Sequence, residues 1–263
     1  ETYLRKRTEE RISRYNEQYQ KLSEAKADSK ELKSEVKEFS KNEEKDREER
    51  KKNTSLTEWD YIREGNAYSN NKEYEKALEA YKRAAGINSS QAGAYLGCGN
   101  AHQRMGEYEK ALEAYAKALE LDPEYVYADN GRGNTYQALG EYEKAVSDYD
   151  KAIGLDPEYV IGYYNRGNAY QAVGKYEEAL ADYSKALELD PKYEYAYNNR
   201  GYTYRAMGDY EKAIADYTQA IQINPGEALY YQNRAKTYRK LGDAEKAEAD
   251  EQKAKEIKEL EQK

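Results

Sequence analysis

Residues that usually build active sites and hydrophobic cores are scarce in this chain of 263 residues, which has one Cys, one His, one Trp, one Phe and two Met. The sole cysteine, Cys98, excludes an internal disulfide framework, and the sole histidine, His102, excludes most metal sites and His-based catalytic sites. No apolar run approaches the ~20 residues of a membrane span, and no signal peptide is present. These absences predict a non-enzymatic protein that has no cofactor, no metal and no membrane span.

Branched aliphatic residues are also few. Leu, Ile, Val and Phe together make up about 12% of the chain, below the ~20% under which a highly charged chain is usually disordered. The formal net charge is −8, from 43 basic and 51 acidic residues. Against disorder stand 34 Ala and 31 Tyr. Small and aromatic residues can replace branched aliphatics if they recur at the right spacing, so the spacing of these two residue types decides whether the chain folds.

The four prolines establish such a spacing. They follow one another at intervals of 34 residues, as Pro123, Pro157, Pro191 and Pro225. A fixed period of this size indicates stacked supersecondary units rather than one globular core. Six units of 34 residues fit between residues 58 and 261, namely 58–91, 92–125, 126–159, 160–193, 194–227 and 228–261. Residues 1–57 do not fit the period.

Each unit is predicted to form two helices. Small residues recur at positions 8, 20 and 27 of the unit, as Gly167, Ala179 and Ala186 do in unit four, and they mark points where two helix backbones approach closely. The Gly at position 15, such as Gly140, suits a helix end that needs a positive φ, and the Pro at position 32 stops the second helix. Tyr recurs at positions 4, 11, 17 and 24, so that 20 of the 31 tyrosines are predicted to fill the core.

This pattern resembles the tetratricopeptide repeat. The segments NRGNAY at 165–170 and ALELDP at 186–191 carry the resemblance, which covers 204 of the 263 residues. It implies an all-α fold, a right-handed α-solenoid of antiparallel helix pairs in which the first helices form a concave groove. In unit six, Glu251 and Glu259 replace the aromatic residue and the Pro, so this unit is expected to act as a C-terminal cap.

Arg and Asp change together within the repeats. Position 7 is Arg132, Arg166, Arg200 and Arg234 in units three to six, and position 23 is Asp148, Asp182, Asp216 and Asp250 in the same units. Units one and two have neither residue at these positions. We expect the Arg and Asp of one unit to pair between its two helices, because a partly buried Arg without a carboxylate would be costly. Shared ancestry of duplicated units, without contact, is the alternative.

The resemblance implies that positions 2, 5, 6, 9, 12 and 13 of each first helix face the groove, which gives 36 residues. None of the 36 is Asp or Glu, although the rest of the solenoid is acidic. The basic residues among them are Arg63, Arg104, Arg205, Lys236, Arg239 and Lys240. A sparse positive lining in an acidic body does not favour nucleic acid as a partner.

Asparagine dominates this lining, as Asn66, Asn100, Asn130, Asn134, Asn165, Asn168, Asn198, Asn199 and Asn233. An amide offers donors and an acceptor together, so a ladder of amides can hold the backbone of an extended peptide with little regard for its sequence. The arrangement resembles the asparagine ladder of the O-GlcNAc transferase superhelix. A helix-packing preference of the repeat is the alternative explanation for the asparagines at position 9.

Four tyrosines of the predicted groove lie outside the core positions, namely Tyr127, Tyr164, Tyr195 and Tyr202. Tyr is a common anchor at interfaces. Trp59, Ile62 and Leu96 make the first end of the groove apolar, while the last end is basic, so a ligand with an apolar end and an acidic end fits its polarity. Packing against a neighbouring helix competes with this role for each tyrosine.

Residues 1–57 hold 16 basic and 14 acidic residues and no Gly or Pro. Apolar residues at helical spacing form two short seams, Ile12 to Leu22 and Leu32 to Phe39, which favour one long helix or a helical hairpin over a disordered chain. These helices are expected to cap the first repeat or to self-associate. Thr57 and Asp60 have the spacing of a helix start, which places the beginning of the solenoid at Glu58.

The sequence thus predicts an adaptor or scaffold that binds an extended segment of a partner protein in its groove. The alternative is a structural element that forms homo-oligomers through the groove or the leader helices. The chain begins with Glu1 rather than Met, so removal of an upstream targeting segment stays open, and a cytoplasmic location is favoured.

Overall fold

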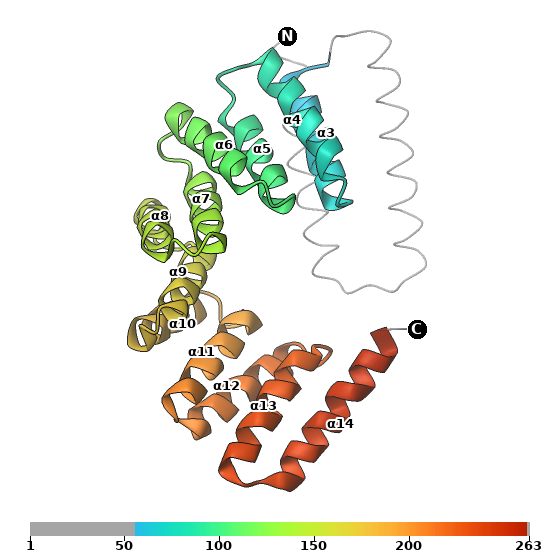
Figure 1. Cartoon of the computed structure of the whole chain (residues 1–263), viewed down its shortest axis with the longest axis vertical. Helices are drawn as coiled ribbons and strands as arrows, with labels where there is room; N and C mark the ends of the chain where they lie inside the picture. Colours follow the sequence, from blue (N-terminus) through green and yellow to red (C-terminus); the bar gives the residue numbers. More distant parts are fainter. Residues whose placement is uncertain (1–55, 262–263) are drawn as a thin grey trace. The chain divides into compact units, whose positions relative to one another are not determined.

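The computed structural model describes residues 56–261, which form helices joined by short turns, without a strand in that range. The first helices of the six units are α3 (Glu58–Asn70), α5 (Ala92–Arg104), α7 (Val126–Ala138), α9 (Val160–Ala172), α11 (Glu194–Met207) and α13 (Ala228–Leu241). The second helices are α4 (Tyr74–Ile87), α6 (Tyr108–Leu121), α8 (Tyr142–Leu155), α10 (Tyr176–Leu189), α12 (Tyr210–Ile223) and α14 (Ala244–Glu261). Figure 1 shows these helices as consecutive antiparallel pairs, as the all-α prediction requires.

The first helix of every unit begins at the residue predicted from the period. At α3 the start is fixed by a capping box: the Thr57 side chain accepts a hydrogen bond from the Asp60 backbone N–H, and the Asp60 carboxylate accepts one from the Thr57 N–H at 3.1 Å. This confirms the helix start predicted from Thr57 and Asp60. The predicted leader helices lie outside the described residues, except for the last two positions of that segment.

Position 15 ends each first helix in the left-handed backbone region. Its five glycines have φ between +76° and +87°, which confirms the predicted stop. In unit one the same position is Lys72, with φ +61°. A residue with a Cβ loses about 1 kcal/mol in this left-handed conformation, and Lys72 adopts it all the same.

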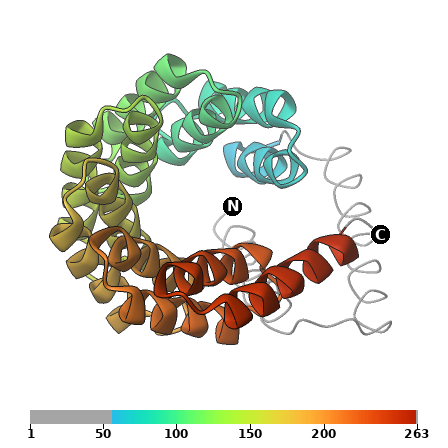
Figure 2. The same cartoon turned by 60° about the horizontal axis from the view of Figure 1, so that its bottom comes forward.

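The stack of helix pairs is curved. Each first helix contacts the first helix of the next unit, whereas no two second helices contact each other within the described range. The first helices therefore lie closer together, on the inner side of the curve. Figure 2 shows the repeat region, taken by itself, following this curved path.

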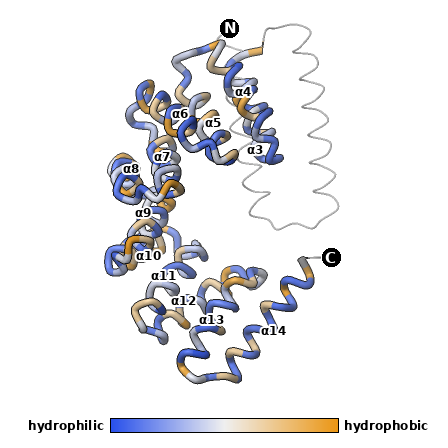
Figure 3. Tube along the Cα trace, in the orientation of Figure 1, coloured by the Kyte–Doolittle hydropathy of each residue, from blue (hydrophilic) through white to orange (hydrophobic). Residues whose placement is uncertain are grey.

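The core of each of the first five units is built around one tyrosine. Tyr81, Tyr115, Tyr149, Tyr183 and Tyr217, all at position 24, are at most 3% exposed. Figure 3 shows hydrophobic residues only in short stretches along the helices. Among the described residues, no helix combines the length and the apolar character needed to cross a membrane.

The predicted Arg–Asp pairs are present in all four units. In unit four, Arg166 donates from Nε and Nη2 to the two carboxylate oxygens of Asp182, at 2.8 and 2.6 Å. The same two-bond geometry joins Arg132 to Asp148, Arg200 to Asp216 and Arg234 to Asp250. These contacts confirm the pairing within each unit and exclude the alternative of shared ancestry without contact.

Three of these arginines also reach the preceding unit. The Nη1 of Arg166 donates to Asp150 at 2.5 Å, and Arg200 and Arg234 donate to the hydroxyls of Ser184 and Thr218. Unit three has no such acceptor behind it, because Ala116 occupies that position. Its Arg132 donates instead to Asp129, at 3.2 Å, which accounts for an Asp at a position that carries Tyr elsewhere. Arg166, Arg200 and Arg234 thus each link two second helices that do not contact each other, whereas Arg132 joins α7 to α8 and makes its second bond within α7.

Candidate functional site

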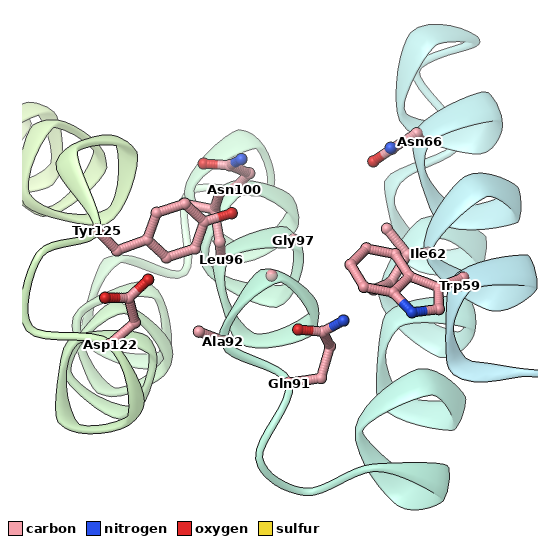
Figure 4. Close-up of a pocket in the computed structure, with 11 residues that line it drawn as sticks. Trp59, Ile62, Asn66, Gln91, Ala92, Leu96, Gly97, Asn100, Asp122 and Tyr125 are labelled. Carbon is pink, nitrogen blue, oxygen red and sulfur yellow. The ribbon is translucent and has the colours of Figure 1, made fainter. Parts of the chain in front are cut away.

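The inner face of the curve contains a pocket at its first end. The pocket has a volume of about 340 Å³, and Figure 4 shows the residues that line it. Seven of them occupy positions 2, 5, 6 or 9 of the first helices of units one and two, and they are Trp59, Ile62, Asn66, Gly93, Leu96, Gly97 and Asn100. These positions therefore share one surface at the first end, in the arrangement that the sequence predicted for the groove.

The asparagines at position 9 have a partner inside each unit. Tyr81, Tyr115, Tyr149 and Tyr183 donate from their hydroxyls to the Oδ1 of Asn66, Asn100, Asn134 and Asn168, at 2.7 to 2.8 Å. Each Oδ1 is therefore engaged in the core, which supports the packing explanation for the carbonyl half of the amide. The Nδ2 groups of Asn66, Asn100 and Asn134 have no protein partner among the described residues, whereas the Asn168 amide also bonds to Tyr164. Three oriented donors therefore remain on the inner face.

The other five asparagines bind mainly to one another. Asn165 donates to Asn130 at 2.8 Å, and Asn233 donates to Asn198 at 2.9 Å, each time from position 6 of one unit to position 5 of the unit before. Asn199 accepts from Asn198 and donates to Asn168 and to the hydroxyl of Tyr164. Asn130, Asn198 and Asn233 are at most 9% exposed. These side chains join neighbouring units, so the inner face offers fewer free amides than the sequence suggested.

Unit five breaks the tyrosine–asparagine pattern. Tyr202 takes the place of the asparagine at position 9, and Arg205 takes the place that Gln103 and Gln137 have in units two and three. Tyr217 is consequently a fully buried tyrosine whose hydroxyl lacks a hydrogen-bond partner. Burial raises the pKa of this hydroxyl, which stays neutral. A hydroxyl that is satisfied in units one to four is thus an unpaired polar group in unit five.

This difference predicts opposite results for the same substitution. Tyr149→Phe removes hydrogen bonds to Asn134 and Gln137 and leaves both acceptors short of a donor, so it should lower the free energy of unfolding by about 1–2 kcal/mol. Tyr217→Phe removes a hydroxyl that has no partner and should leave stability unchanged or raise it. Urea unfolding followed by circular dichroism checks both variants. Equal losses would show that the Tyr217 hydroxyl has a partner.

The predicted groove tyrosines differ in exposure. Tyr127, Tyr195 and Tyr202 are 60%, 50% and 44% exposed. Tyr164 is half-buried, and its ring packs edge-on against Tyr193 with the centroids 5.1 Å apart. The alternative of packing against a neighbour therefore applies to Tyr164, while the other three present most or much of their rings to solvent.

Exposed apolar residues recur at position 2, the second residue of the first helices. Trp59, Tyr127, Ile161, Tyr195 and Leu229 are between 44% and 60% exposed. Only unit two departs, because Gly93 occupies its position 2. Trp59 and the two tyrosines were predicted from the sequence, whereas Ile161, Leu229 and Gly93 were not, although the period gives all six the same position in the repeat.

The basic residues of the inner face divide into paired and unpaired groups. Arg239 donates to both carboxylate oxygens of Glu251, at 2.8 and 2.7 Å, and Arg63 donates to Asp60 at 3.3 Å. Arg205 lies over the ring of Tyr202, 4.9 Å from its centroid. Arg104, Arg205, Lys236 and Lys240 have no acidic partner within residues 56–261. The positive lining is therefore weaker than the sequence suggested, and three of its four unpaired cations belong to units five and six.

Neither Cys98 nor His102 has the surroundings of a reactive or metal-binding side chain. Cys98 is buried against Ala77 and Tyr81, and burial raises the pKa of its thiol to about 11. His102 is 7% exposed, and its Nδ1 lies 2.5 Å from a carboxylate oxygen of Glu107. No group of His, Cys, Asp and Glu side chains in the described part of the chain could hold a metal ion.

Comparison with known families agrees with the period. The tetratricopeptide repeat model matches residues 92–125, 160–193 and 194–227, which are three of the predicted units. A second model, described as TPR repeat, matches 65–106 and 133–174, and a third, again a tetratricopeptide repeat, matches 216–249. No curated protein sequence matches the chain significantly.

Solved structures with the same architecture include two that are similar in sequence. The crystal structure of MamA is 30% identical in sequence, and the match covers 62% of this chain and 95% of the MamA chain, with a TM-score of 0.57. YrrB, described as a TPR protein with an unusual peptide-binding site, is 28% identical in sequence. The match covers 68% of this chain and 93% of the YrrB chain, with a TM-score of 0.55.

The pilF protein of Pseudomonas aeruginosa shares the fold at 22% identity and a TM-score of 0.67, and the match covers 73% of this chain and 88% of pilF. The same 34-residue repeat is found in three ways. The prolines give the period, the structure has a helix pair that begins at each predicted unit with a positive φ at position 15, and the repeat models match the same region. The chain therefore belongs to the tetratricopeptide repeat family.

Proposed function

We propose that the protein is a non-enzymatic scaffold that binds an extended segment of a partner protein along the inner face of its repeats. The observation that carries the proposal is the row of exposed apolar side chains at position 2 in five of the six units. Exposed apolar residues in a contiguous arrangement are typical of an interaction surface. Their recurrence with the repeat suits a ligand that crosses several units rather than a compact one.

The free amide donors suit the backbone of such a ligand. The tyrosine hydroxyls fix the Oδ1 of Asn66, Asn100 and Asn134, and this orients each free Nδ2 before a ligand binds. An Nδ2 donor pairs with a peptide carbonyl. Side-chain contacts at position 2 together with backbone contacts at position 9 would hold an extended peptide, and unpaired Arg205, Lys236 and Lys240 favour an acidic residue at its far end.

The experiment uses peptides selected from a random library on the full chain. Binding is then measured by fluorescence anisotropy for the wild type and for a groove variant, Tyr127→Ala with Tyr195→Ala, which removes two exposed rings. We expect the dissociation constant to rise by about tenfold or more, as for aromatic anchors at other interfaces. Asn134 and Asn168 are poorer choices, because their removal would take one of two acceptors from the Tyr149 hydroxyl and leave the Tyr183 hydroxyl without an acceptor.

The matched control removes apolar surface from the opposite ends of the same two helices. Leu139 follows α7 and Met207 ends α11, and they are 37% and 44% exposed. The double variant Leu139→Ala with Met207→Ala should bind the peptide as the wild type does. Equal affinity in the groove variant and the wild type would rule out the inner face as the binding surface.

Homo-oligomer formation through the inner face or the leader is the alternative that the same measurements can detect. The exposed apolar residues at position 2 would also suit a second copy of the chain. In that case sedimentation would give a mass that rises with concentration, and the groove variant would lower it. A constant monomer mass together with peptide binding supports the scaffold.

A further inference from the structure

The pocket of Figure 4 exists because one unit lacks the side chain that the others carry. In unit three, Tyr127 at position 2 lies between two aromatic residues at position 34, with its ring centroid 6.1 Å from Tyr125 and 5.9 Å from Tyr159. In unit five, Tyr195 packs in the same way on Tyr193, at 5.7 Å. Gly93 is the position 2 residue of unit two, between Gln91 and Tyr125, and both of these line the empty space.

Packing does not require a glycine at residue 93. A Cβ on Gly93 would meet only the hydroxyl of Tyr125, at 3.6 Å, an ordinary contact distance. Gly97, in the same helix, is different, because a Cβ there would lie 2.5 Å from the ring of Tyr81. The core thus explains Gly97 and leaves Gly93 unexplained, apart from the space it opens.

The walls of this space are aromatic and apolar. Figure 4 shows Trp59 and Ile62 of α3 on one side and Tyr125 on the other, with Leu96 and Gly97 of α5 between them. Trp59 is 52% exposed, so one of the largest apolar side chains of the chain is left without cover. Asp122 also lines the pocket, but its side chain accepts a hydrogen bond from the Glu124 N–H in the turn after α6.

Asp156 and Asp190 occupy the equivalent turn position and accept the same bond. The Asp122 carboxylate is therefore a feature of the repeat turn rather than of the pocket. The pocket volume is at the lower end of the range for ligand sites, which suits one large side chain rather than a longer segment.

We infer that this pocket binds one aromatic side chain of the partner peptide, which takes the place of the ring that unit two lacks. The inference rests on the proposed function, and it specifies which type of ligand side chain is bound at the first end of the groove. A guest ring there would have Tyr125 on one side, as Tyr127 has Tyr159, and Gln91 in place of the second tyrosine at position 34, with Trp59 as a further aromatic neighbour.

The test compares two substitutions of the same residue in the full chain. Gly93→Tyr supplies the ring found in units three and five and should fill the pocket, whereas Gly93→Ala adds one methyl group and should leave it open. Peptides selected on the wild type should carry an aromatic residue at one fixed position. Gly93→Tyr should weaken their binding by about ten- to hundredfold, the value of burying one such side chain, and Gly93→Ala by less than about threefold.

Two controls make the result specific. An unfolding temperature of Gly93→Tyr equal to that of the wild type would show that the substitution leaves the fold intact. Asp122→Asn keeps the turn hydrogen bond, as Asn88 and Asn224 do at the equivalent position, and should change affinity by less than about twofold.

Four results would overturn the inference. Selected peptides without a fixed aromatic residue, which still depend on Tyr127 and Tyr195, would leave the proposed function standing and remove this pocket from it. Enrichment of Lys or Arg together with a large loss in Asp122→Asn would assign the pocket to a cation. A change in Trp59 emission with protein concentration alone would identify the occupant as a second copy. If no peptide binds, the proposed function fails as well.

Discussion

Asp182→Ala should lower the stability of the protein by about 2–4 kcal/mol, as expected when one partner of a largely buried ion pair is removed. The Asp182 side chain is 7% exposed and that of Arg166 is 20% exposed. Hydrogen bonds from Arg166 to Asp182 raise the pKa of the guanidinium, so the arginine would stay charged in a half-buried place without its two-bond partner. Thermal unfolding should occur about 5–12 °C lower than in the wild type.

The chain offers its own control for this substitution. Unit two has Cys98 and Ala114 where unit four has Arg166 and Asp182, so the double variant Arg166→Cys with Asp182→Ala copies a combination that already folds. It should lose less than about half of the stability that the single variant loses, because no unpaired charge is left behind.

A second control is Glu188→Ala, at a side chain that is 69% exposed, which should move the unfolding temperature by no more than about 1 °C. If Asp182→Ala and Glu188→Ala have equal effects, the pairs do not stabilise the fold.

Gly133→Ala should be the second strongly destabilising change, at a cost of about 2–3 kcal/mol from overpacking. A Cβ at this position would lie 2.7 Å from Cε1 and 2.9 Å from Cδ1 of the Tyr149 ring. That ring is fully buried, and its hydroxyl is held by Asn134, so it cannot turn away without losing a hydrogen bond. The clash outweighs the roughly 1 kcal/mol that Ala normally gains over Gly in a helix.

Gly154→Ala provides the matched comparison in α8. A Cβ on Gly154 meets nothing within 4 Å, so the helix preference of Ala is unopposed and the variant should be about 0.5 kcal/mol more stable than the wild type. Denaturant unfolding of the two variants should therefore give changes of opposite sign. Changes of the same sign would mean that the close contact between the helix of Gly133 and Tyr149 is not rigid.

The fold could be predicted because each position of the repeat occurs six times in the sequence, so that its residue types can be compared between units. The helix starts, the glycine turns and the Arg–Asp pairs each recur, and a residue that recurs with its partner in the same units indicates contact. Arg132 and Asp148 illustrate this, because both appear first in unit three. The additional contact of Arg132 with Asp129 was not foreseen, because it occurs only once.

The candidate site was harder to predict, because an amide at one spacing can bind a ligand, a neighbour or the core. The hydroxyl of Tyr183 reaches Asn168, 15 residues earlier, and this spacing recurs in units one to four. Unit five keeps the tyrosine without the asparagine, so the spacing alone did not identify the contact. A signal for part of the network did exist: Asn130 and Asn165, and again Asn198 and Asn233, stand 35 residues apart, and both pairs are joined by hydrogen bonds. Exposure at position 2 and the pocket at Gly93 depend on packing and required the structure.

The emission of Trp59 tests most directly whether a partner peptide occupies the inner face. Trp59 is the sole tryptophan of the chain, it is half-exposed, and it lines the pocket at the first end of the groove, so it reports binding there without any substitution. Addition of a selected peptide should shift the emission to shorter wavelength, with the same dissociation constant that anisotropy gives. A peptide that binds by anisotropy and leaves the Trp59 emission unchanged would exclude the first end of the inner face, with its pocket, from the binding surface and contradict the account there.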